Sequence, residues 1–434
     1  MSQLNNLRKV IDQIDEQILD LIKSRIDVVV EIGEIKKENN SEIVDEKREG
    51  EIYGRLVKKA AEKGIKPSVV KKVWKALIEI SYEVEGGKNG NVEVFNKYQV
   101  YIGSGLLSSL EEIIDLKKFS KAIVITDDKI PPHFLSGFEK IAVSSGEENK
   151  TIETIKEIWE HLLKLGADRK TLVINLGGGV IGDMGGFAAS TYMRGIKFIQ
   201  IPTTLLSAVD ASVGGKVGID FAGIKNLIGS FNQPIGVIID IDTFDTLPDR
   251  EFVSGFGEII KHGVIADSEY FDVVISKKPR EFSKTELTEI IKRSCEIKSE
   301  VISSDEKESG DRKKLNFGHT IGHAIESFSL MTDKPLLHGE AVGLGMIAEA
   351  KISSLLGLTA EDNVIKIKQV LENASLPVNY KTTDTQALIN LISKDKKAEG
   401  GKVNWTLIKA IGEAVINQDV DTETVKQALQ FISE

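Results

Sequence analysis

Two histidines in the segment Leu315–Glu326, which reads LNFGHTIGHAIE, have the spacing of a metal site on a helix. His323 follows His319 by four residues, so a helix would hold both imidazoles on one face, about 6 Å apart along its axis. A third histidine, His338, follows in the run LLHGEAVGLGM. Imidazole is the commonest metal ligand, and a catalytic zinc usually has three protein ligands and one open position. The alternative is a chance pair on a solvated helix face, and the flanking residues decide between the two.

Charged and amide side chains accompany these histidines. Glu258 and Lys261 lie one helical turn apart in GEIIKHG, where His262 also forms a rival metal pair with Glu258. Further such residues lead into the histidine segment or precede it, namely Lys216, Lys298, Glu308, Arg312 and Asn316. Many cations beside a carboxylate–histidine set indicate an anionic, phosphorylated substrate held against a metal. Any one of these lysines, taken alone, is more often a solvated surface residue.

The elements that must position these residues follow two patterns. Short apolar runs alternate with helical patterns up to about residue 245, which predicts an α/β region with a mostly parallel sheet. Strands are expected at 98–102, 122–126, 171–176, 198–201 and 237–241. From Pro248 onward nearly all patterns are helical, which predicts a second, helical region.

A glycine-rich turn follows the expected strand 171–176. The run GGGVIGD matches G-x-G-x-x-G between a strand and a helix, where backbone amides can meet a pyrophosphate. The acidic residue of an ordinary dinucleotide fingerprint is missing, and Pro202, Thr203 and Thr204 lie in its place, so a standard dehydrogenase is not predicted. Other polar groups fall at expected strand ends and loops, where α/β sheets bind ligands: Asp127, Glu147, Lys150, Asp210, Lys216, Lys225, Asn226 and Thr246.

Composition limits the class of protein. The chain has 434 residues, enough for two or three domains, and a net charge of −10, which argues against nucleic-acid binding. It has no apolar run long enough for a membrane span and no signal-peptide pattern at its start, so we expect a cytoplasmic protein that does not bind membranes. The single cysteine, Cys295, excludes an intrachain disulfide.

The first 85 residues predict a helical region of their own. Apolar residues from Leu4 to Ile35 keep alternating three- and four-residue spacing, which indicates a long helix with a coiled-coil-like seam. Arg25 interrupts that seam, and Arg8 and Lys36 lie beside it. On one straight helix Arg8 and Lys36 are about 42 Å apart, so they can share a small-molecule site only if a partner chain supplies one of them. A shared site therefore requires at least a dimer, whereas the alternative is three solvated cations on a helix edge.

Residues 4–85 resemble the all-helical type of chorismate mutase along their whole length. The resemblance rests on Arg8, Arg25, Lys36, the cluster Asp45-x-x-Arg48-Glu49, Ser81 and Glu85. It implies that Arg8 and Arg25 hold the two carboxylates of chorismate, with Arg8 coming from the partner chain. It also implies that Arg48, Asp45, Glu49 and Ser81 complete substrate binding, and that Lys36 and Glu85 face the ether oxygen whose bond breaks. The rearrangement to prephenate needs no nucleophile and no proton transfer, only a held conformer and well-placed charge.

Residues 92–434 resemble 3-dehydroquinate synthase. The motifs are dense: GGGVIGDMGGFAASTYMRG, IPTTLLSAVDASVGGKVGID, KNLIGSFNQP, EFVSGFGEIIKHG, LNFGHTIGHAIE and LLHGEAVGLGM. The resemblance implies an NAD-binding α/β domain followed by a helical metal domain, with the site between them. It implies Zn²⁺, or Co²⁺, held by Glu258, His319 and His338, so that His323 is a catalytic group and His262 is structural.

The same resemblance assigns the remaining residues. NAD would contact Asp127, Glu147, Lys150, Gly178, Gly179, Asp183, Thr203, Thr204 and Thr246. The substrate, 3-deoxy-D-arabino-heptulosonate 7-phosphate, would contact the catalytic set Asp210, Lys216, Lys261, Lys298, Arg312, Asn316 and His323. Further substrate contacts would come from Lys225, Asn226, Glu308, Lys396 and Lys397, and from Arg194 reaching across a dimer.

We therefore expect a multidomain chain with a chorismate-mutase-like helical domain at 1–88, an α/β Rossmann-like NAD domain at 89–245 and an all-α metal domain at 246–434. The expected function is a bifunctional shikimate-pathway enzyme, a homodimer or higher homo-oligomer, that acts on two small-molecule substrates. The alternative for the first domain is a chorismate or prephenate sensor, or a dimerisation arm. A metal-dependent polyol dehydrogenase, or a cyclase for another sugar phosphate, is the alternative for the rest.

Overall fold

The computed structural model describes residues 2–38, 46–67, 69–70, 72–74, 77–78, 81, 90–94, 97–305, 310–381, 384–398 and 403–434. Contacts between Cα atoms divide the chain into two compact units, Met1–Asn89 and Gly90–Glu434. No helix in the described part of the chain is both long and apolar enough to cross a membrane.

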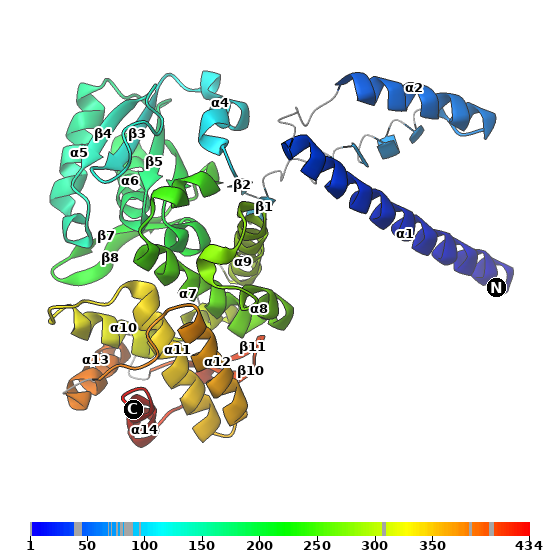
Figure 1. Cartoon of the computed structure of the whole chain (residues 1–434). Coiled ribbons are helices and arrows are strands. Elements are labelled where there is room, and N and C mark those ends of the chain that lie inside the picture. Colours follow the sequence, from blue (N-terminus) through cyan, green and yellow to red (C-terminus); the bar gives the residue numbers. More distant parts are fainter. Residues whose placement is uncertain are drawn as a thin grey trace. The chain divides into compact units, whose positions relative to one another are not determined.

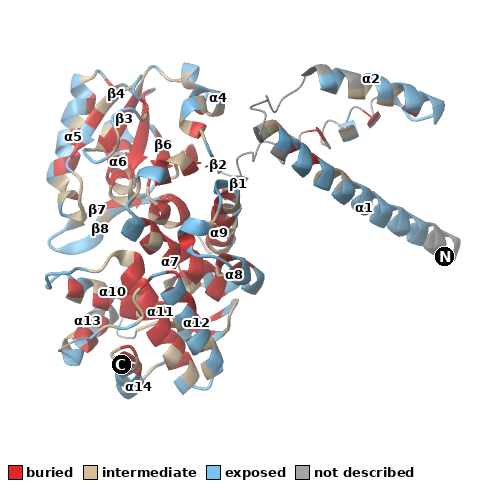
Figure 2. Ribbon diagram, in the orientation of Figure 1, coloured by how far each residue is buried: buried red, intermediate tan, exposed pale blue. Residues whose placement is uncertain are grey.

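The first unit is helical, as predicted. Helix α1 (Ser2–Glu38) is continuous, α2 (Glu46–Glu62) follows, and the described residues between 67 and 81 are largely helical (Figure 1). The apolar seam of α1 is largely exposed in the single chain, where Figure 2 colours most of this helix as accessible. Ile11, Ile14, Ile18, Leu21 and Val28 are among its exposed residues. A long helix with an exposed apolar stripe is typical of a segment that packs against a further helix.

A seven-stranded sheet forms the first part of the second unit, in the order β1-β2-β9-β6-β5-β3-β4. Only β1 and β2 pair antiparallel, and the other pairs are parallel. All five expected strands are present, and β1 and β4 are additional. The strands are β1 (Gly90–Val94), β2 (Tyr98–Gly103), β3 (Ala122–Asp127), β4 (Glu139–Val143), β5 (Leu172–Gly177), β6 (Lys197–Pro202) and β9 (Gly236–Asp240).

Apolar layers cover both faces of this sheet. Helices α5 (Ile152–Lys164) and α6 (Gly179–Thr191) pack on one face, where Ile125, Ile158 and Met184 belong to one core. The segment from Leu106 to Phe138, which includes the short helix α4 (Leu110–Ile113), covers the other face. Parallel strands buried on both faces read as near-continuous apolar runs, and β5 is buried at all six positions.

Two antiparallel hairpins were not predicted. Strands β7 (Lys216–Phe221) and β8 (Ile224–Phe231) pair with each other outside the main sheet. Strands β10 (Trp405–Ala410) and β11 (Glu413–Gln418) pair within the helical region, which is therefore not entirely helical.

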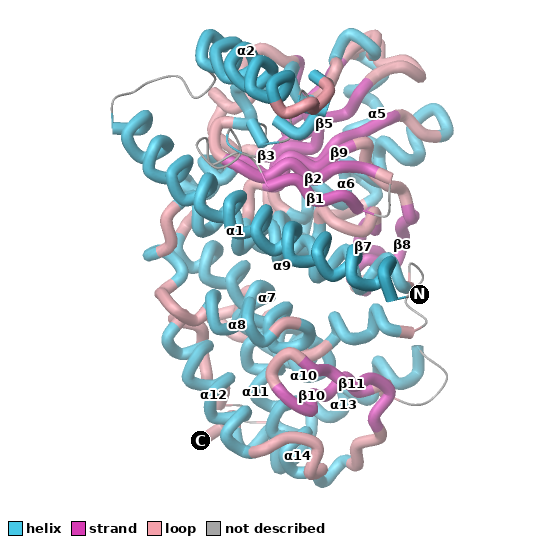
Figure 3. The backbone as a smooth tube through the Cα atoms, turned by 90° about the vertical axis from the view of Figure 1, so that its right-hand side faces the viewer, coloured by secondary structure: helices cyan, strands magenta, loops and turns pink. Residues whose placement is uncertain are grey.

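The helical region is built around α11 (His338–Leu355), which is buried along nearly its whole length (Figure 2). A helix that is apolar all round must be enclosed by others, and α7, α10, α12 and α14 contact it (Figures 1 and 3). The helices of this region are α7 (Asp249–Ala266), α8 (Ser268–Val274), α9 (Lys284–Ser304), α10 (His319–Ser329), α12 (Glu361–Asn373), α13 (Thr385–Ala398) and α14 (Thr422–Phe431).

Candidate active site

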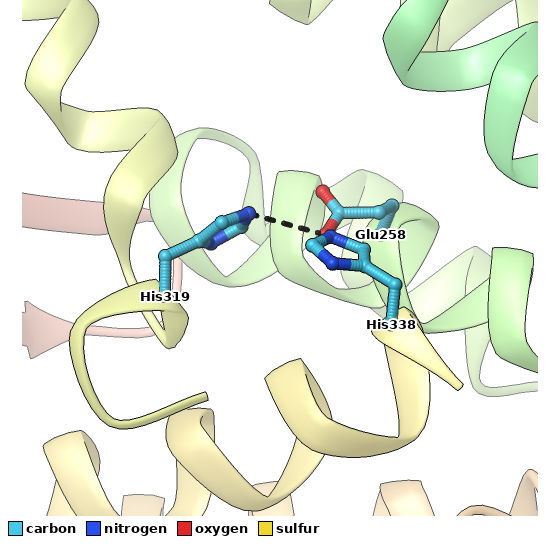
Figure 4. A group of neighbouring side chains, drawn as sticks. All are labelled: Glu258, His319 and His338. Atoms are coloured by element: carbon cyan, nitrogen blue, oxygen red, sulfur yellow. Dashed lines mark ion pairs between the residues drawn. The ribbon is translucent and has the colours of Figure 1, made fainter. Parts of the chain in front are cut away.

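Three helices bring one carboxylate and two imidazoles together. Glu258 is fully buried on α7, and the side chains of His319, at the start of α10, and His338, at the start of α11, point toward it (Figure 4). Glu258 Oε1 lies 3.6 Å from His319 Nε2 and 3.5 Å from His338 Nε2. One ligand atom from each residue can be chosen so that all three lie within 4.8 Å of one another.

This geometry fits a tetrahedral metal ion. Ligand atoms about 2.0–2.1 Å from a zinc are about 3.3 Å from one another, close to the two separations above. Glu258 Oε1 is buried and accepts no hydrogen bond from the described residues, which is costly unless a cation completes the site. Both imidazoles have their Nδ1 occupied, His319 toward the carbonyl oxygen of Phe317 at 3.2 Å and His338 toward Glu326 Oε2 at 3.2 Å. These contacts leave the two Nε2 atoms for a metal.

Protonation of the two imidazoles differs with their surroundings. Burial lowers the pKa of His319 well below its ordinary value, so this imidazole is in the neutral form that a metal requires. Burial also lowers the pKa of His338, but the negative charges of Glu258 and Glu326, together with the hydrogen bond that His338 donates to Glu326, outweigh it and raise that pKa to about 10. Metal binding at these residues would therefore displace a proton from His338.

A second acidic group beside this centre is neutralised by lysines. Asp210, Glu258 and His262 also offer atoms within 4.8 Å of one another. However, Lys298 Nζ lies 2.6 Å from Asp210 Oδ1, and Lys261 Nζ is ion-paired to Glu258 Oε2. Burial raises the pKa of Asp210, yet the ammonium of Lys298 holds it below its ordinary value. Two ammonium groups would repel a second cation there.

A cavity of about 630 Å³ opens onto the imidazoles. Its lining includes two apolar side chains of the unpredicted hairpin, Leu227 and Phe231. Most of the expected substrate residues also line it, together with the expected NAD residue Asp183 and the expected metal ligands His319 and His338. The substrate residues in the lining are Asp210, Lys216, Asn226, Lys261, Lys298, Arg312, Asn316 and His323. Four of these residues are lysines or arginine, so the cavity suits an anion next to a metal.

The residues expected to contact NAD gather at one edge of the sheet. Asp127 ends β3, Gly178 and Gly179 follow β5, and Thr203 and Thr204 follow β6, so all lie where parallel strands end at their carboxyl side. Glu147 lies in the turn after β4, and Thr246 ends the short helix that follows β9.

Lys150 joins this edge to the hairpin. Its buried ammonium lies 2.7 Å from Asp183 Oδ2, 2.5 Å from Asn226 Oδ1 and 3.7 Å from Glu147 Oε1. Burial raises the pKa of Asp183 to about 6, and the charge of Lys150 offsets part of that increase.

Family models match most of the second unit. Residues 140–254 match the N-terminal model of 3-dehydroquinate synthase, and residues 255–398 match its C-terminal model. The 3-dehydroquinate synthase of Ruminiclostridium cellulolyticum is 40% identical over 349 residues, which cover 77% of this chain and 96% of that protein. The one from Thermodesulfovibrio yellowstonii is 43% identical over 347 residues, which cover 76% and 96%. The chain belongs to the 3-dehydroquinate synthase family.

Residues 7–86 of the present chain match the family model of chorismate mutase type II. The chain is therefore a fusion of the two enzyme families. Solved structures agree with the synthase fold. The structure of 2-deoxy-scyllo-inosose synthase with carbaglucose-6-phosphate, NAD⁺ and Co²⁺ has a TM-score of 0.72 and 25% identity, and the match covers 79% of this chain and 99% of that one. The 2-epi-5-epi-valiolone synthase of Streptomyces hygroscopicus, with NAD⁺ and Zn²⁺, has a TM-score of 0.70 and 26% identity, with coverage of 77% and 96%.

Two expected substrate residues of the synthase unit lie apart from the cavity lining. Arg194 is exposed after α6, in a left-handed conformation with φ 71°. Lys225 Nζ lies 2.8 Å from Glu326 Oε1, and so pairs with a helix of the metal region. Glu308 lies outside the described residues, as do the side chains of Lys396 and Lys397 on α13.

The chorismate mutase unit shows part of its expected site. Arg25 Nη1 donates to the carbonyl oxygen of Leu77 at 2.8 Å, and Ser81 Oγ donates to the same oxygen at 2.8 Å. Ser81 is buried, Lys36 is half-buried, and Arg8 and Arg48 are exposed. Asp45, Glu85 and the side chain of Glu49 lie outside the described residues.

Sequence reasoning missed two carboxylates that contact the metal region. Glu326 binds His338 and Lys225 as described above, and its place at the end of the motif LNFGHTIGHAIE is the signal that could have found it. Glu349 is fully buried on α11 and accepts hydrogen bonds from the backbone of α10. Its signal is a lone carboxylate inside an otherwise apolar run, GMIAEA.

Proposed function

We propose that the unit Gly90–Glu434 converts 3-deoxy-D-arabino-heptulosonate 7-phosphate to 3-dehydroquinate and phosphate, with NAD and Zn²⁺ or Co²⁺ as cofactors. The observation that carries this proposal is a single cavity lined by four cationic side chains and by two imidazoles of a carboxylate–histidine centre. A phosphorylated substrate with vicinal hydroxyls requires both features, the cations for the phosphate and the metal for the hydroxyls.

Separate groups of residues would bind the metal, NAD and the substrate. Glu258, His319 and His338 would hold the metal, and the expected NAD residues at the sheet edge would hold the nicotinamide cofactor. When bound, the two cofactors supply a Lewis acid for the substrate hydroxyls and a reversible hydride acceptor. Lys216, Lys298 and Arg312 would balance the charge of the phosphate and carboxylate, while Asn316 and His323 would orient polar groups of the sugar ring.

Other sugar phosphates are the nearest alternative substrates. The two solved relatives named above are synthases with other products, and their identity to this chain is 25–26%, against 40–43% for the two 3-dehydroquinate synthases. The difference in identity favours dehydroquinate as the product. A probable glycerol dehydrogenase from Sinorhizobium meliloti shares the fold at 13% identity and a TM-score of 0.53. The four cations of the cavity argue against a polyol as substrate.

A chelator experiment tests the assignment. We expect removal of metal to abolish phosphate release from the heptulosonate phosphate and to spare chorismate rearrangement, because the metal centre lies wholly in the second unit. The His319→Ala variant should reproduce the effect of the chelator, and Arg25→Ala should do the opposite. Equal loss of both activities in chelator would contradict two separate sites.

For the first unit we propose chorismate mutase activity. Arg25 and Ser81 converge on one backbone oxygen, and the family model spans residues 7–86. The alternative is a sensor: chorismate would then persist unchanged while its addition alters the rate of phosphate release. Formation of prephenate, lost in Arg25→Ala, would exclude that alternative.

The first unit also supports a homodimer. Because α1 is one continuous helix, Arg8 and Lys36 lie about 42 Å apart along it, too far for one small molecule. A second copy that packs on the exposed seam of α1 would bring its own Arg8 to the distant end. For the whole chain we propose a cytoplasmic enzyme of small-molecule substrates, with domain boundaries near residues 88 and 245.

A further inference from the structure

Glu349 caps a helix that is not its own. It lies about three turns beyond His338 on α11, and its side chain is fully buried. Its Oε2 accepts a hydrogen bond from the backbone N–H of Gly318 at 2.6 Å, and its Oε1 accepts one from Ile321 at 3.0 Å. Gly318 is the N-cap of α10, and His319 is its first residue. The first amides of a helix have no partner within the helix, so Glu349 satisfies two of them.

Packing explains why the cap comes from a neighbouring helix. A serine, threonine or aspartate at an N-cap position normally does this work. Position 318 cannot carry such a side chain, because its φ is +82° and a Cβ there would lie 2.6 Å from Met346 Cγ. The two helices also touch through their backbones, since a Cβ on Gly345 would lie 1.9 Å from the carbonyl oxygen of Gly318.

Capping a helix with a fully buried carboxylate costs desolvation free energy. Burial raises the pKa of Glu349 to about 8, and the groups in the described chain that act against this are backbone amides of α10 rather than cations. The positive end of the helix dipole is what favours the charge there. Such a residue is explained best if the exact placement of the first turn of α10 matters.

The first turn of α10 determines the position and orientation of the His319 imidazole. The Nδ1 of His319 lies 3.2 Å from the carbonyl oxygen of Phe317, the residue just before the capped glycine. The contact with Phe317 selects the tautomer of His319, and the position of the turn relative to α11 sets the distance of its Nε2 from His338, which α11 itself carries. The hydrogen bonds of Glu349 go to the backbone at Gly318 and Ile321, so it acts on His319 through the backbone.

We propose that Glu349 is a positioning residue for the metal centre, which ties the first turn of α10 to α11 so that His319 and His338 hold metal-ligand spacing. The inference rests on the proposed metal function of these histidines. Outer-shell partners of a metal ligand typically contribute about 10–100-fold to metal affinity. Glutamine at 349 keeps one carbonyl acceptor, whereas methionine fills a similar volume with none, so the two variants should show graded losses.

The test is a Co²⁺ titration of the metal-free, full-length protein, read from the absorption bands of the bound ion. Against wild type, we expect Glu349→Gln to weaken Co²⁺ binding about 10-fold and Glu349→Met about 100-fold, with shifted bands in both variants. Asp421→Ala, which removes the N-cap of α14, is the control for a simple loss of helix capping and should bind Co²⁺ as wild type does.

The outcomes distinguish an error in the proposed metal centre from an error in the positioning role of Glu349. If His319→Ala binds Co²⁺ as well as wild type does, the proposed metal centre itself is wrong. If His319→Ala loses Co²⁺ but Glu349→Gln and Glu349→Met keep wild-type affinity and bands, the centre stands and the positioning role is wrong. If Glu349→Met does not fold, Glu349→Gln decides, because it preserves the shape of the side chain.

Discussion

Residues that hydrogen-bond to the proposed metal ligands determine how the imidazoles of those ligands are oriented. Glu326 accepts from His338 Nδ1 at 3.2 Å and pairs with Lys225 at 2.8 Å. The carboxylate fixes the tautomer of His338 and so directs its Nε2 toward Glu258.

Glu326→Gln should therefore weaken Zn²⁺ binding about 10-fold or more, since an amide accepts a weaker hydrogen bond from the imidazole. Competition with a chromogenic chelator measures the affinity. Glu361→Gln, which removes a carboxylate paired with Lys351 on the neighbouring helix, is the matched control and should bind Zn²⁺ normally. Equal Zn²⁺ affinities for wild type and Glu326→Gln would show that Glu326 does not contribute to metal binding.

Glu349 should also make the free energy of unfolding depend on pH. Its pKa is about 8 in the folded chain and near 4.5 in an unfolded one. The folded state therefore holds an extra proton between these values, and the stability this contributes is full below about pH 4.5 and is lost as pH rises through 8. Urea unfolding from pH 5 to 9 should show wild type losing stability relative to Glu349→Gln as pH rises. A constant difference between the two would show that the pKa of Glu349 is not raised.

At the level of helices, glycines next to the ligands let the backbones meet. A Cβ on Gly339, beside His338, would lie 1.8 Å from the carbonyl oxygen of Ser254 on α7. Gly345 makes the comparable contact with the start of α10. The helices that carry the proposed metal ligands, α7, α10 and α11, are thus packed too closely at these points for any side chain.

Gly345→Ala should destabilise the protein by about 1–3 kcal/mol and weaken metal binding, because it forces α10 and α11 apart. Gly343→Ala on the same helix is the control, since its new Cβ would meet Leu371 at an ordinary 3.5 Å. Urea unfolding with a parallel Co²⁺ titration measures both effects. A Gly345→Ala protein that behaves like Gly343→Ala would refute the close packing.

The strands show where sequence patterns suffice and where they do not. Strands buried on both faces, such as β5, appear as near-continuous apolar runs, so their positions could be predicted. The hairpin β7–β8 could not, because β8 exposes apolar and polar residues alike and shows no alternation. The grouping of Glu258, His319 and His338 followed from family motifs. The sequence could single out Glu326 and Glu349 as candidates, but their partners depend on contacts between helices that no local pattern encodes.

For the whole molecule, the shared mutase site can be tested by complementation. Arg8→Ala and Arg25→Ala should each be inactive as mutases. Mixed under conditions of subunit exchange, they should recover about one quarter of wild-type activity, because half the dimers are mixed and each of these has one intact site. Mass spectrometry of differently tagged subunits verifies the exchange. No recovery despite exchange would mean that each site lies within one chain.

The exposed stripe on α1 has a consequence for how the two units respond to concentration. The core of Gly90–Glu434 closes within one chain, whereas an apolar stripe completed by a second copy is stabilised by mass action. Each tenfold dilution would then remove about 1.4 kcal/mol from each dimer of first units, which is about 0.7 kcal/mol per chain, while the core of the second unit loses nothing. One polypeptide would thus hold two folding equilibria, and only one of them would depend on how much of the protein a cell makes.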